Sequence, residues 1–370
     1  MKTKRCFISF LAAAGFLAAA AWCQGQSAQA KPIRVGIIRC DYHGMYYGPL
    51  MGKHDPARLR DPMKDKPGAS YYSWQKGGSH FAFYRNYGDP AQMTIPTVDG
   101  FEVVKVWDEH RDAAEAAAAI FINPPEVCDS FEEVSDGVDL VLIGDCNYEG
   151  SDHLQLAAPG LKKGVPTFVD KPFAETFKDA KEMVRLSEEH GAPLMSLSIL
   201  RELPAAKLFK NRFVEIEPIR FGVVRGAGEK LAAQIHGLSL AQLLFGDGVE
   251  TVECFGRKPL AYIRLDFGQK PGRPESGVMI LNDSGKTSVD SQFFAAAYSE
   301  QGAVHSRALN WYTFPYGALE IIKLMKTMVL TKTSPVPHGE MLELIAVVEA
   351  ARLSQKETRP VAVAEISGTR

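Results

Sequence analysis

Asp170-Lys171-Pro172 is the segment of this sequence whose residue types and position best suit catalysis. It follows the apolar run 164–169 and opens a stretch in which apolar residues recur at helical spacing. Lys171 is therefore expected at the carboxyl end of a buried strand, where open α/β sheets bind their ligands. The alternative interpretation is an ordinary strand-to-helix turn, in which Pro172 starts the helix and Lys171 is solvated.

Two other side chains join Lys171 as candidates. His236 precedes an apolar stretch with helical spacing, and a histidine near its unperturbed pKa accepts a proton at neutral pH. Arg201 directly follows the apolar run 194–200 and is a candidate contact for a substrate hydroxyl or carboxylate. A solvent-facing histidine at a helix start and a surface salt bridge of the arginine are the corresponding structural alternatives.

The elements that must position these residues alternate between strands and helices in the first half of the chain. We expect strands at 31–38, 101–107, 138–143, 165–169 and 194–200, and helices at 111–121, 154–161 and 176–190. This alternation predicts parallel βαβ units, and hence an α/β, doubly wound domain over residues 31–200.

Residues 201–370 have a different pattern, typical of an α+β domain. Short alternating runs at 219–225, 262–267 and 277–282 are separated by Gly, Pro, Asn and Asp, and helices are expected at 235–244, 317–330 and 340–354. We predict a mainly antiparallel sheet with one face covered by these helices. A chain of 370 residues is long enough for two such domains.

Residues 45–97 form an unusually long interruption of the first crossover and are rich in aromatic residues, Gly, Pro and His. Insertions of this length are generally functional or disordered, and the aromatic content argues against disorder. We expect an ordered cap near the site, with a packing or oligomer contact as the alternative.

Residues 1–30 have the pattern of a signal peptide. Lys2, Lys4 and Arg5 precede the apolar run 7–22, and Ala28-Gln29-Ala30 follows it. Residues 3–7 are similar to a twin-arginine signal with a lysine in place of the first arginine. We therefore expect export to the periplasm or the medium, by the Sec route or a twin-arginine-like route, and no membrane span in the mature chain.

The remaining composition excludes several classes of protein. The formal net charge of −2 gives no footprint for nucleic acid or an anionic membrane. The cysteines form no CxxC pair, so neither a zinc site nor a dense disulfide framework is indicated. GxSxG, HExxH and GxxxxGK[ST] motifs are absent from the sequence.

In this order, the motifs resemble those of the Gfo/Idh/MocA family of glucose-fructose oxidoreductases and inositol dehydrogenases. Asp170-Lys171-Pro172 is similar to the Glu-Lys-Pro motif of that family, with an acid one carbon shorter. The strand and loop 139–147, His153, and His236 with the helix after it match further family positions. The resemblance covers nearly the whole mature chain. It implies a Rossmann-like dinucleotide-binding domain followed by a domain for substrate binding and oligomerisation.

The resemblance also implies a role for each matching residue. Lys171 would lie beside the nicotinamide and the reacting carbon, and His236 would take the hydroxyl proton. Arg201 and His236 would contact the substrate. The implied cofactor-binding residues are Arg39, Asp41, Gly44, Asp108, Asn147, His153, Asp170 and Lys171. Asp108 favours NAD over NADP, because a carboxylate at the end of the second strand repels a 2′-phosphate.

The phosphate-binding loop departs from the family pattern. Where GxGxxG is expected, the chain reads Arg39-Cys40-Asp41-Tyr42-His43-Gly44 and keeps only the last glycine. The Asp41 carboxylate would repel the pyrophosphate, and Arg39 would offset part of that repulsion. We therefore expect either a retained NAD or NADP, tightly bound because free nicotinamide is scarce outside the cytoplasm, or a loop that has lost the dinucleotide.

The residues expected to transfer the proton also depart from the family pattern. The position four residues before His236 is an aspartate in the family and Ala232 here, so Glu229 or a residue of segment 45–97 is the expected substitute. Ser239 stands where several relatives have an acidic residue.

The sequence thus predicts an exported NAD(P)-dependent oxidoreductase that acts on a CH–OH group of a sugar, cyclitol or glycoside, as a homo-oligomer by resemblance. A cofactor-recycling glycoside lyase or hydrolase, and a carbohydrate-binding protein without the dinucleotide, are the alternatives. A metal-dependent lyase would need a site at Asp41, His43, His54 and His80, but their irregular spacing indicates no metal site.

Overall fold

The computed structural model describes residues 31–40, 43–55, 58, 97–144, 147–283, 293–310 and 313–368. Pro32–Arg370 make one compact unit, and everything below concerns the described residues of that unit. The expected signal peptide and most of segment 45–97 lie outside the described residues, as do Asp41 and His80.

The first sheet has six parallel strands in the order β3-β2-β1-β4-β5-β6. Their bounds are β1 Ile33–Ile38, β2 Phe101–Trp107, β3 Glu126–Val127, β4 Leu140–Ile143, β5 Thr167–Val169 and β6 Leu194–Met195. Every residue of β4 is buried, as expected for a parallel strand covered on both faces. This is the doubly wound Rossmann order, whose switch point lies between β1 and β4. The predicted fold class of the first half is confirmed.

Helices cover this sheet, and the sequence signals for them are local. They are α1 Gly44–Met51, α4 Arg111–Ala118, α5 His153–Lys162 and α6 Phe177–His190, with a 3₁₀ turn at Glu133–Ser135. α6 begins where the Thr176 side chain accepts a hydrogen bond from the backbone N–H of Asp179, and it ends at Gly191 in the left-handed region. These are the boundaries that the capping residues predict.

The strand expected at 194–200 is wrong beyond Met195. β6 ends there, and Ser198 begins the short helix α7 (Ile199–Glu202) by accepting the backbone N–H of Leu200. A serine before apolar residues is a strong helix N-cap, and here it outweighs the β-propensity of the run. Arg201 therefore lies on a helix. The expected domain boundary at residue 200 stays a prediction, and α7 spans it.

The second sheet has seven strands in the order β12-β11-β7-β10-β9-β8-β13. Their bounds are β7 Phe221–Arg225, β8 Thr251–Phe255, β9 Tyr262–Asp266, β10 Val278–Leu281, β11 Phe294–Ser299, β12 Gly302–His305 and β13 Val361–Ala362. Only the β7–β10 pair is parallel among these described strands. The mainly antiparallel sheet is thus confirmed.

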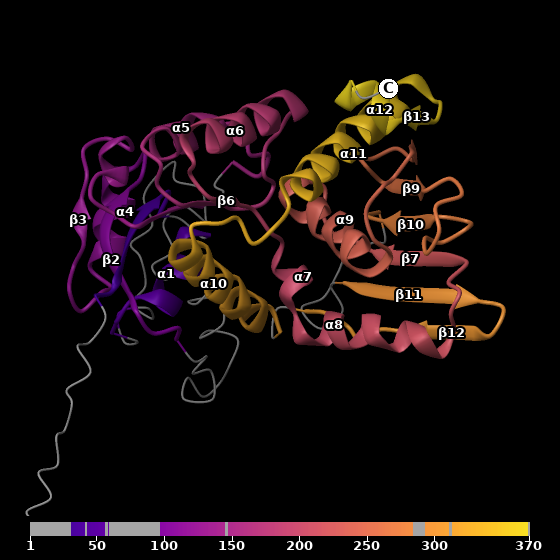
Figure 1. Ribbon diagram of the computed structural model, residues 1–370, viewed down its shortest axis with the longest axis horizontal. Coiled ribbons are helices and arrows are strands. Elements are labelled where there is room, and N and C mark those ends of the chain that lie inside the picture. The colour runs from indigo at the N-terminus through magenta and orange to yellow at the C-terminus, as the bar shows by residue number, and fades with distance from the viewer. Residues whose placement is uncertain are drawn as a thin grey trace, which may run out of the picture. The chain divides into compact units, whose positions relative to one another are not determined.

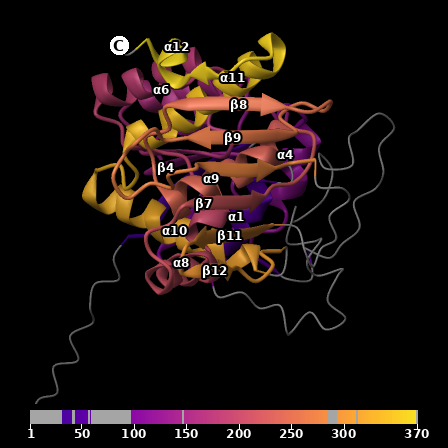
Figure 2. The ribbon, with the colours of Figure 1, turned by 90° about the vertical axis from the view of Figure 1, so that its right-hand side faces the viewer.

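One face of this sheet is covered and the other is open. Buried and partly exposed residues alternate along β7 and β9, and α9 (Leu231–Phe245) packs on β7 and β10. In Figure 2 the strands lie in front of the helices, so the viewer sees the open face.

The remaining elements are α8 Pro204–Asn211, a 3₁₀ turn at Arg212–Glu215, α10 Phe314–Thr331, α11 His338–Glu357 and α12 Val363–Ser367.

The prediction that α10 covers the second sheet is wrong. α10 packs against α1 and α7, beside the first sheet (Figure 1). A Cβ on its Gly317 would lie 2.3 Å from the carbonyl oxygen of Ile199, so the two helices approach as closely as glycine allows. α11 packs on both β8 and α6, and its Glu349 accepts the backbone N–H of Phe177. The two sheets are thereby joined through helices.

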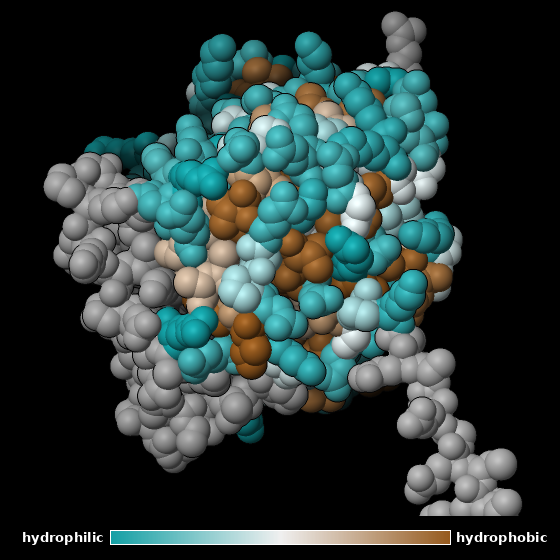
Figure 3. Space-filling model, turned by 90° about the vertical axis from the view of Figure 1, so that its left-hand side faces the viewer, coloured by the Kyte–Doolittle hydropathy of each residue, from teal (hydrophilic) through white to brown (hydrophobic). Residues whose placement is uncertain are grey.

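Figure 3 shows the side of the molecule at the first sheet. Hydrophilic residues cover much of the described surface there, with apolar residues in smaller groups between them. Among the described helices, none is both long and apolar enough to cross a membrane.

Candidate functional site

Lys171 lies two residues after the end of β5, and its peptide bond to Pro172 is cis. Its side chain is only 8% exposed, and Nζ donates a hydrogen bond to the carbonyl oxygen of Ala232 on α9, 3.0 Å away. The backbone N–H of Ala232 in turn donates to the carbonyl oxygen of Tyr148. The first turn of α9 therefore holds the lysine at the carboxyl edge of the first sheet.

Asp170 joins this turn to the loop after β1. Its Oδ2 lies 2.5 Å from Nδ1 of His43, and the residue is 2% exposed. Burial raises the pKa of Asp170, but the charge and hydrogen bond of His43 and the charge of Lys171 outweigh it, so the pKa lies well below its usual range. The acid of the motif is therefore an anion that faces the His43 ring and the Lys171 side chain.

His236 lies on α9, one turn after Ala232, and is buried. Its Nδ1 lies 2.6 Å from Oγ of Ser198, and its ring stacks near Phe314 and meets the edge of Phe293, with centroids 6.4 and 5.6 Å away. Burial, and then the charge of Lys171, hold the pKa of His236 well below its usual value. The imidazole is therefore neutral at neutral pH and in the form that accepts a proton.

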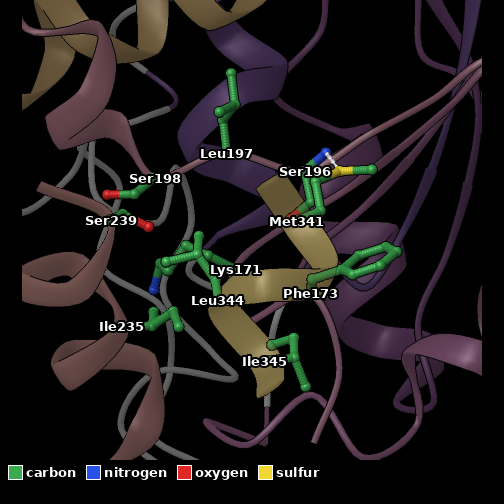
Figure 4. Close-up of a pocket in the computed structure, with 10 residues that line it drawn as sticks. All are labelled: Lys171, Phe173, Ser196, Leu197, Ser198, Ile235, Ser239, Met341, Leu344 and Ile345. Carbon is green, nitrogen blue, oxygen red and sulfur yellow. Dashed lines mark hydrogen bonds between the residues drawn. The ribbon is translucent and has the colours of Figure 1, made fainter. Parts of the chain in front are cut away.

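Lys171 and the residues around His236 line one pocket (Figure 4). The lining residues come from the β5 turn, the segment after β6, α9 and α11: Lys171, Phe173, Ser196, Leu197, Ser198, Ile235, Ser239, Met341, Leu344 and Ile345. In Figure 4 the nitrogen of Lys171 points toward the helix that carries Ile235. The lining thus combines one cation, hydroxyl groups and an apolar wall.

The loop after β1 makes the tight turn that a dinucleotide requires, although it lacks the first glycine. Arg39 adopts the left-handed conformation, with φ 69°. A Cβ on Gly44 would lie 2.0 Å from the carbonyl oxygen of Arg39, and one on Gly144 would lie 2.6 Å from the backbone nitrogen of Gly44. The start of α1 therefore lies against the end of β4 and against Arg39 at distances that only glycine permits. The described loop residues fit a pyrophosphate at the amino end of α1.

The Arg39 side chain is held at the ends of β2 and α5. Its guanidinium lies 5.6 Å from the ring centre of Trp107 and donates to Glu109 and Asp152, each at 2.6 Å. Asn147 donates to the other oxygen of Asp152 at 2.8 Å. Arg39 and Asn147 both belong to the set expected to hold the cofactor, and the fold brings them together at Asp152.

Asp108 was expected to contact the ribose, but its side chain is buried and bonded to the backbone. It is 6% exposed, and its two oxygens accept the backbone N–H groups of Cys40 and His110 at 2.8 and 2.9 Å. Burial raises the pKa of Asp108 despite these hydrogen bonds. Asp108 therefore fixes the loop to the end of β2, whereas the next residue, Glu109, has an exposed carboxylate.

His153 and Arg201 are both bonded to neighbouring elements, and neither lines the pocket. His153 is fully buried at the start of α5, with Nδ1 3.3 Å from the carbonyl oxygen of Phe173, so it supports the turn after Lys171. Arg201 donates to Gln242 and to Glu340 at 2.5 and 2.6 Å. Its salt bridge ties α7 to α11 and does not occupy the pocket.

The expected substitute for the missing aspartate is not Glu229, since its exposed carboxylate pairs with Lys258 at 2.9 Å. Among the described residues, Ser198 is the side chain bonded to His236. The described residues also include no group of three or more His, Cys, Asp or Glu side chains that would hold a metal ion.

Sequence reasoning missed His43 and Ser198 as parts of the site. The pairing of His43 with Asp170 spans 127 residues, and nothing local indicates it. Ser198 carried a signal, because Ser196 and Ser198 interrupt an otherwise apolar run and buried hydroxyl groups need partners.

Part of the chain is similar in sequence to known proteins. Residues 81–197 match the model of the GFO_IDH_MocA oxidoreductase family, which has an NAD-binding Rossmann fold. An inositol 2-dehydrogenase of Cereibacter sphaeroides is 31% identical over 113 residues, which are 30% of this chain and 33% of that protein. The chain thus matches about a third of the length of such curated relatives.

Solved structures extend the likeness in fold to most of the chain. An oxidoreductase from Agrobacterium radiobacter, in complex with NAD+, L-tartaric acid and magnesium, has a TM-score of 0.63 at 16% identity and covers 90% of this chain and 99% of that one. A myo-inositol 2-dehydrogenase from Lactobacillus plantarum has a TM-score of 0.65 at 12% identity, with coverage of 90% and 99%. Over residues 81–197 the chain is thus similar to the Gfo/Idh/MocA family of oxidoreductases, and the solved structures show the same two-sheet fold.

Proposed function

We propose that this protein is an NAD(P)-dependent dehydrogenase that oxidises a CH–OH group of a sugar, cyclitol or glycoside. The observation that carries the proposal is the position of Lys171 and His236. The buried cation Lys171 lines a pocket at the carboxyl edge of a Rossmann sheet, and the buried neutral imidazole of His236 is bonded to Ser198, which lines the same pocket. This is the edge at which such sheets bind nucleotide and substrate.

The two residues divide the work on the substrate hydroxyl. His236 accepts the hydroxyl proton, and the ammonium of Lys171 stabilises the negative charge on the oxygen as the C–H bond breaks. Bound NAD supplies the hydride acceptor. The carbinol thereby loses one hydride and one proton and becomes a carbonyl group. Phe293 and Phe314 shield the imidazole from water.

The charges at the end of β2 favour NAD as the cofactor. Glu109 is exposed beside Arg39, and it would repel a 2′-phosphate at the position where such folds bind the ribose. Arg39 is already paired with two carboxylates, so its charge is compensated. NAD without the 2′-phosphate fits this arrangement better.

The proposal is tested with the purified protein and a panel of polyols, cyclitols and glycosides. NADH formation by the wild type, with a loss of about 100-fold or more in kcat for Lys171→Ala and for His236→Ala, is expected. Dinucleotide binding, followed by nicotinamide fluorescence, should persist in His236→Ala, because His236 is not among the implied cofactor-binding residues. Glu229→Gln serves as a control, because Glu229 pairs with Lys258 at the surface.

The results also separate the alternatives. A cofactor-recycling lyase or hydrolase would release a glycosidic leaving group without net NADH formation. A carbohydrate-binding protein would bind sugar with neither nicotinamide fluorescence nor turnover, and that result would overturn the proposal.

Export and assembly remain proposals from the sequence. Residues 1–30 have the signal-peptide pattern, and an exported dehydrogenase would need a tightly bound cofactor that is recycled on the protein. Nicotinamide absorbance in protein purified from the periplasm or the medium supports this, and a protein confined to the cytoplasm contradicts it. A homo-oligomer is expected by resemblance, and light scattering after gel filtration tests it.

A further inference from the structure

We infer that Ser198 is the positioning residue of His236: its oxygen accepts the hydrogen of Nδ1 and so leaves Nε2 as the basic nitrogen. The inference rests on the proposed function, in which His236 accepts the proton of the substrate hydroxyl. This chain thus has a neutral serine–histidine pair. The aspartate that the family has one turn before the histidine is replaced by Ala232.

The surroundings of His236 leave this role to Ser198. Ala232, one turn earlier, offers only backbone groups, and its carbonyl oxygen binds Lys171. Glu229 points to Lys258 at the surface. Within the described part of the chain, Ser198 is the residue that hydrogen-bonds the imidazole, and the contact is short, at 2.6 Å.

The backbone fixes the Ser198 oxygen before His236 meets it. Ser198 is the N-cap of α7, in an extended conformation, and Oγ accepts the backbone N–H of Leu200 at 3.2 Å. A hydroxyl has two lone pairs and one hydrogen. One lone pair is used by Leu200, and the second is available to an N–H of the imidazole. The hydrogen of the hydroxyl is then directed into the pocket that Ser198 lines.

The chemistry selects between the two tautomers. If Ser198 donated to Nδ1, Nε2 would carry the hydrogen of the neutral ring and could not accept a proton from substrate. If Nδ1–H donates to Ser198, Nε2 is free to accept, and the hydrogen bond persists unchanged in the imidazolium. The second arrangement needs no reorganisation during the reaction, which is the property expected of a preorganised site.

A hydroxyl partner also differs from a carboxylate in its effect on basicity. It carries no charge and gives the imidazolium little stabilisation, while Lys171 and burial disfavour the charged ring. The charged and titratable groups that act on His236 are Lys171, Asp170 and His43, and the rings of Phe293 and Phe314 complete its surroundings. Ser198 therefore orients a base that stays neutral over a wide range of pH.

The direct test is nitrogen NMR of protein labelled with ¹⁵N-histidine, because protonated and bare ring nitrogens resonate far apart. The His236 signals are assigned by their loss in His236→Gln. We expect the hydrogen on Nδ1 in the wild type and in Ser198→Asp, whose carboxylate can only accept. In Ser198→Ala we expect a mixture of tautomers. Ser239→Ala removes a buried hydroxyl of the same pocket without a bond to His236, so its spectrum should match that of the wild type.

A kinetic arm separates positioning from simple loss of structure. Ser198→Ala should lower kcat by at least about tenfold with little change in KM, and Ser198→Thr should restore most of it. Ser198→Asp keeps the helix cap and should move the acidic limb of the pH profile to higher pH, because an anion raises the pKa of His236. If Ser198→Ala fails to fold, the spectrum and pH profile of Ser198→Asp decide the question.

The outcomes distinguish the two proposals. A hydrogen on Nε2 in the wild type, or an unchanged Nδ1 hydrogen in Ser198→Ala, would overturn the role of Ser198. No turnover with any polyol, together with the expected tautomer and its loss in Ser198→Ala, would contradict the proposed dehydrogenase and leave Ser198 as the residue that orients His236.

Discussion

His43 and Asp170 lie 127 residues apart in the sequence, yet His43 Nδ1 and Asp170 Oδ2 are 2.5 Å apart in the structure. His43 belongs to the loop that replaces a glycine-rich phosphate loop, and Asp170 precedes the candidate catalytic lysine. The contact therefore joins the cofactor loop to the turn that holds Lys171, so the two parts of the site are held in fixed relation to each other.

Loss of His43 should destabilise the fold. Asp170 is an anion that is almost fully buried, and removing the side chain bonded to a buried carboxylate leaves that charge uncompensated. We expect His43→Ala to lower the free energy of unfolding by about 3 kcal/mol at pH 7, measured by urea denaturation. His43→Asn keeps an N–H donor close to the position of Nδ1, so its free energy of unfolding should fall clearly less than that of His43→Ala. Equal losses in both variants would show that packing, and not the contact with Asp170, is responsible.

The same pair has a pH signature. The folded-state pKa of Asp170 is lowered, so the stabilisation is present above its unfolded pKa of about 3.9 and is lost as the pH falls below that value. The difference in stability between the wild type and His43→Ala should therefore shrink below about pH 4. A difference that stays constant down to pH 3 would contradict this assignment.

His236 should titrate abnormally, and Lys171 should be part of the reason. Burial and the Lys171 charge lower its pKa, so below about pH 6.5 the unfolded chain binds a proton that the folded protein rejects, and stability falls. Lys171→Met should raise the pKa of His236 in an NMR titration and reduce that fall. Lys171→Arg keeps the cation and should leave the pKa near its wild-type value. The same rise in both variants would assign the effect to a change in packing.

The sequence was informative wherever local chemistry decides the structure. Alternating strands and helices, Thr176 and Gly191 at the ends of α6, and the family motif at Lys171 predict most of the first sheet and the place of the candidate site. The N-cap of Ser198 was equally local, but the apolar run around it favoured a strand.

The errors come from contacts between distant segments. An apolar helix face does not say which surface it packs on, so α10 was assigned to the wrong sheet. Nor does a carboxylate at a strand end show whether it faces a ligand or the backbone. The two backbone N–H groups that Asp108 accepts belong to a loop formed 68 residues earlier and to its own turn, and they become visible only in three dimensions.

Glu109 should control the choice between the two dinucleotides. Its exposed carboxylate pairs with Arg39 at the end of β2, and the loss of this negative charge leaves Arg39 available to a 2′-phosphate. Glu109→Gln should tighten binding of NADPH relative to NADH by up to about fivefold, measured by nicotinamide fluorescence. Glu115→Gln breaks another exposed pair, with Arg111 on α4, and should leave the ratio unchanged. An unchanged ratio in Glu109→Gln would place the ribose away from this carboxylate.

Gly44 should be indispensable to the loop, although two of the three expected glycines are missing. A Cβ at this position would lie 2.0 Å from the carbonyl oxygen of Arg39, a backbone atom that cannot yield without moving the turn between β1 and α1. Gly44→Ala should therefore lower the free energy of unfolding by about 2 kcal/mol or more and abolish NADH binding measured by fluorescence. Gly339→Ala, in α11 with nothing within 4 Å of its added Cβ, should be neutral or slightly stabilising. If Gly44→Ala instead bound NADH as the wild type does, the pyrophosphate could not lie against this turn, and the dinucleotide would have to be sought away from the switch point between β1 and β4.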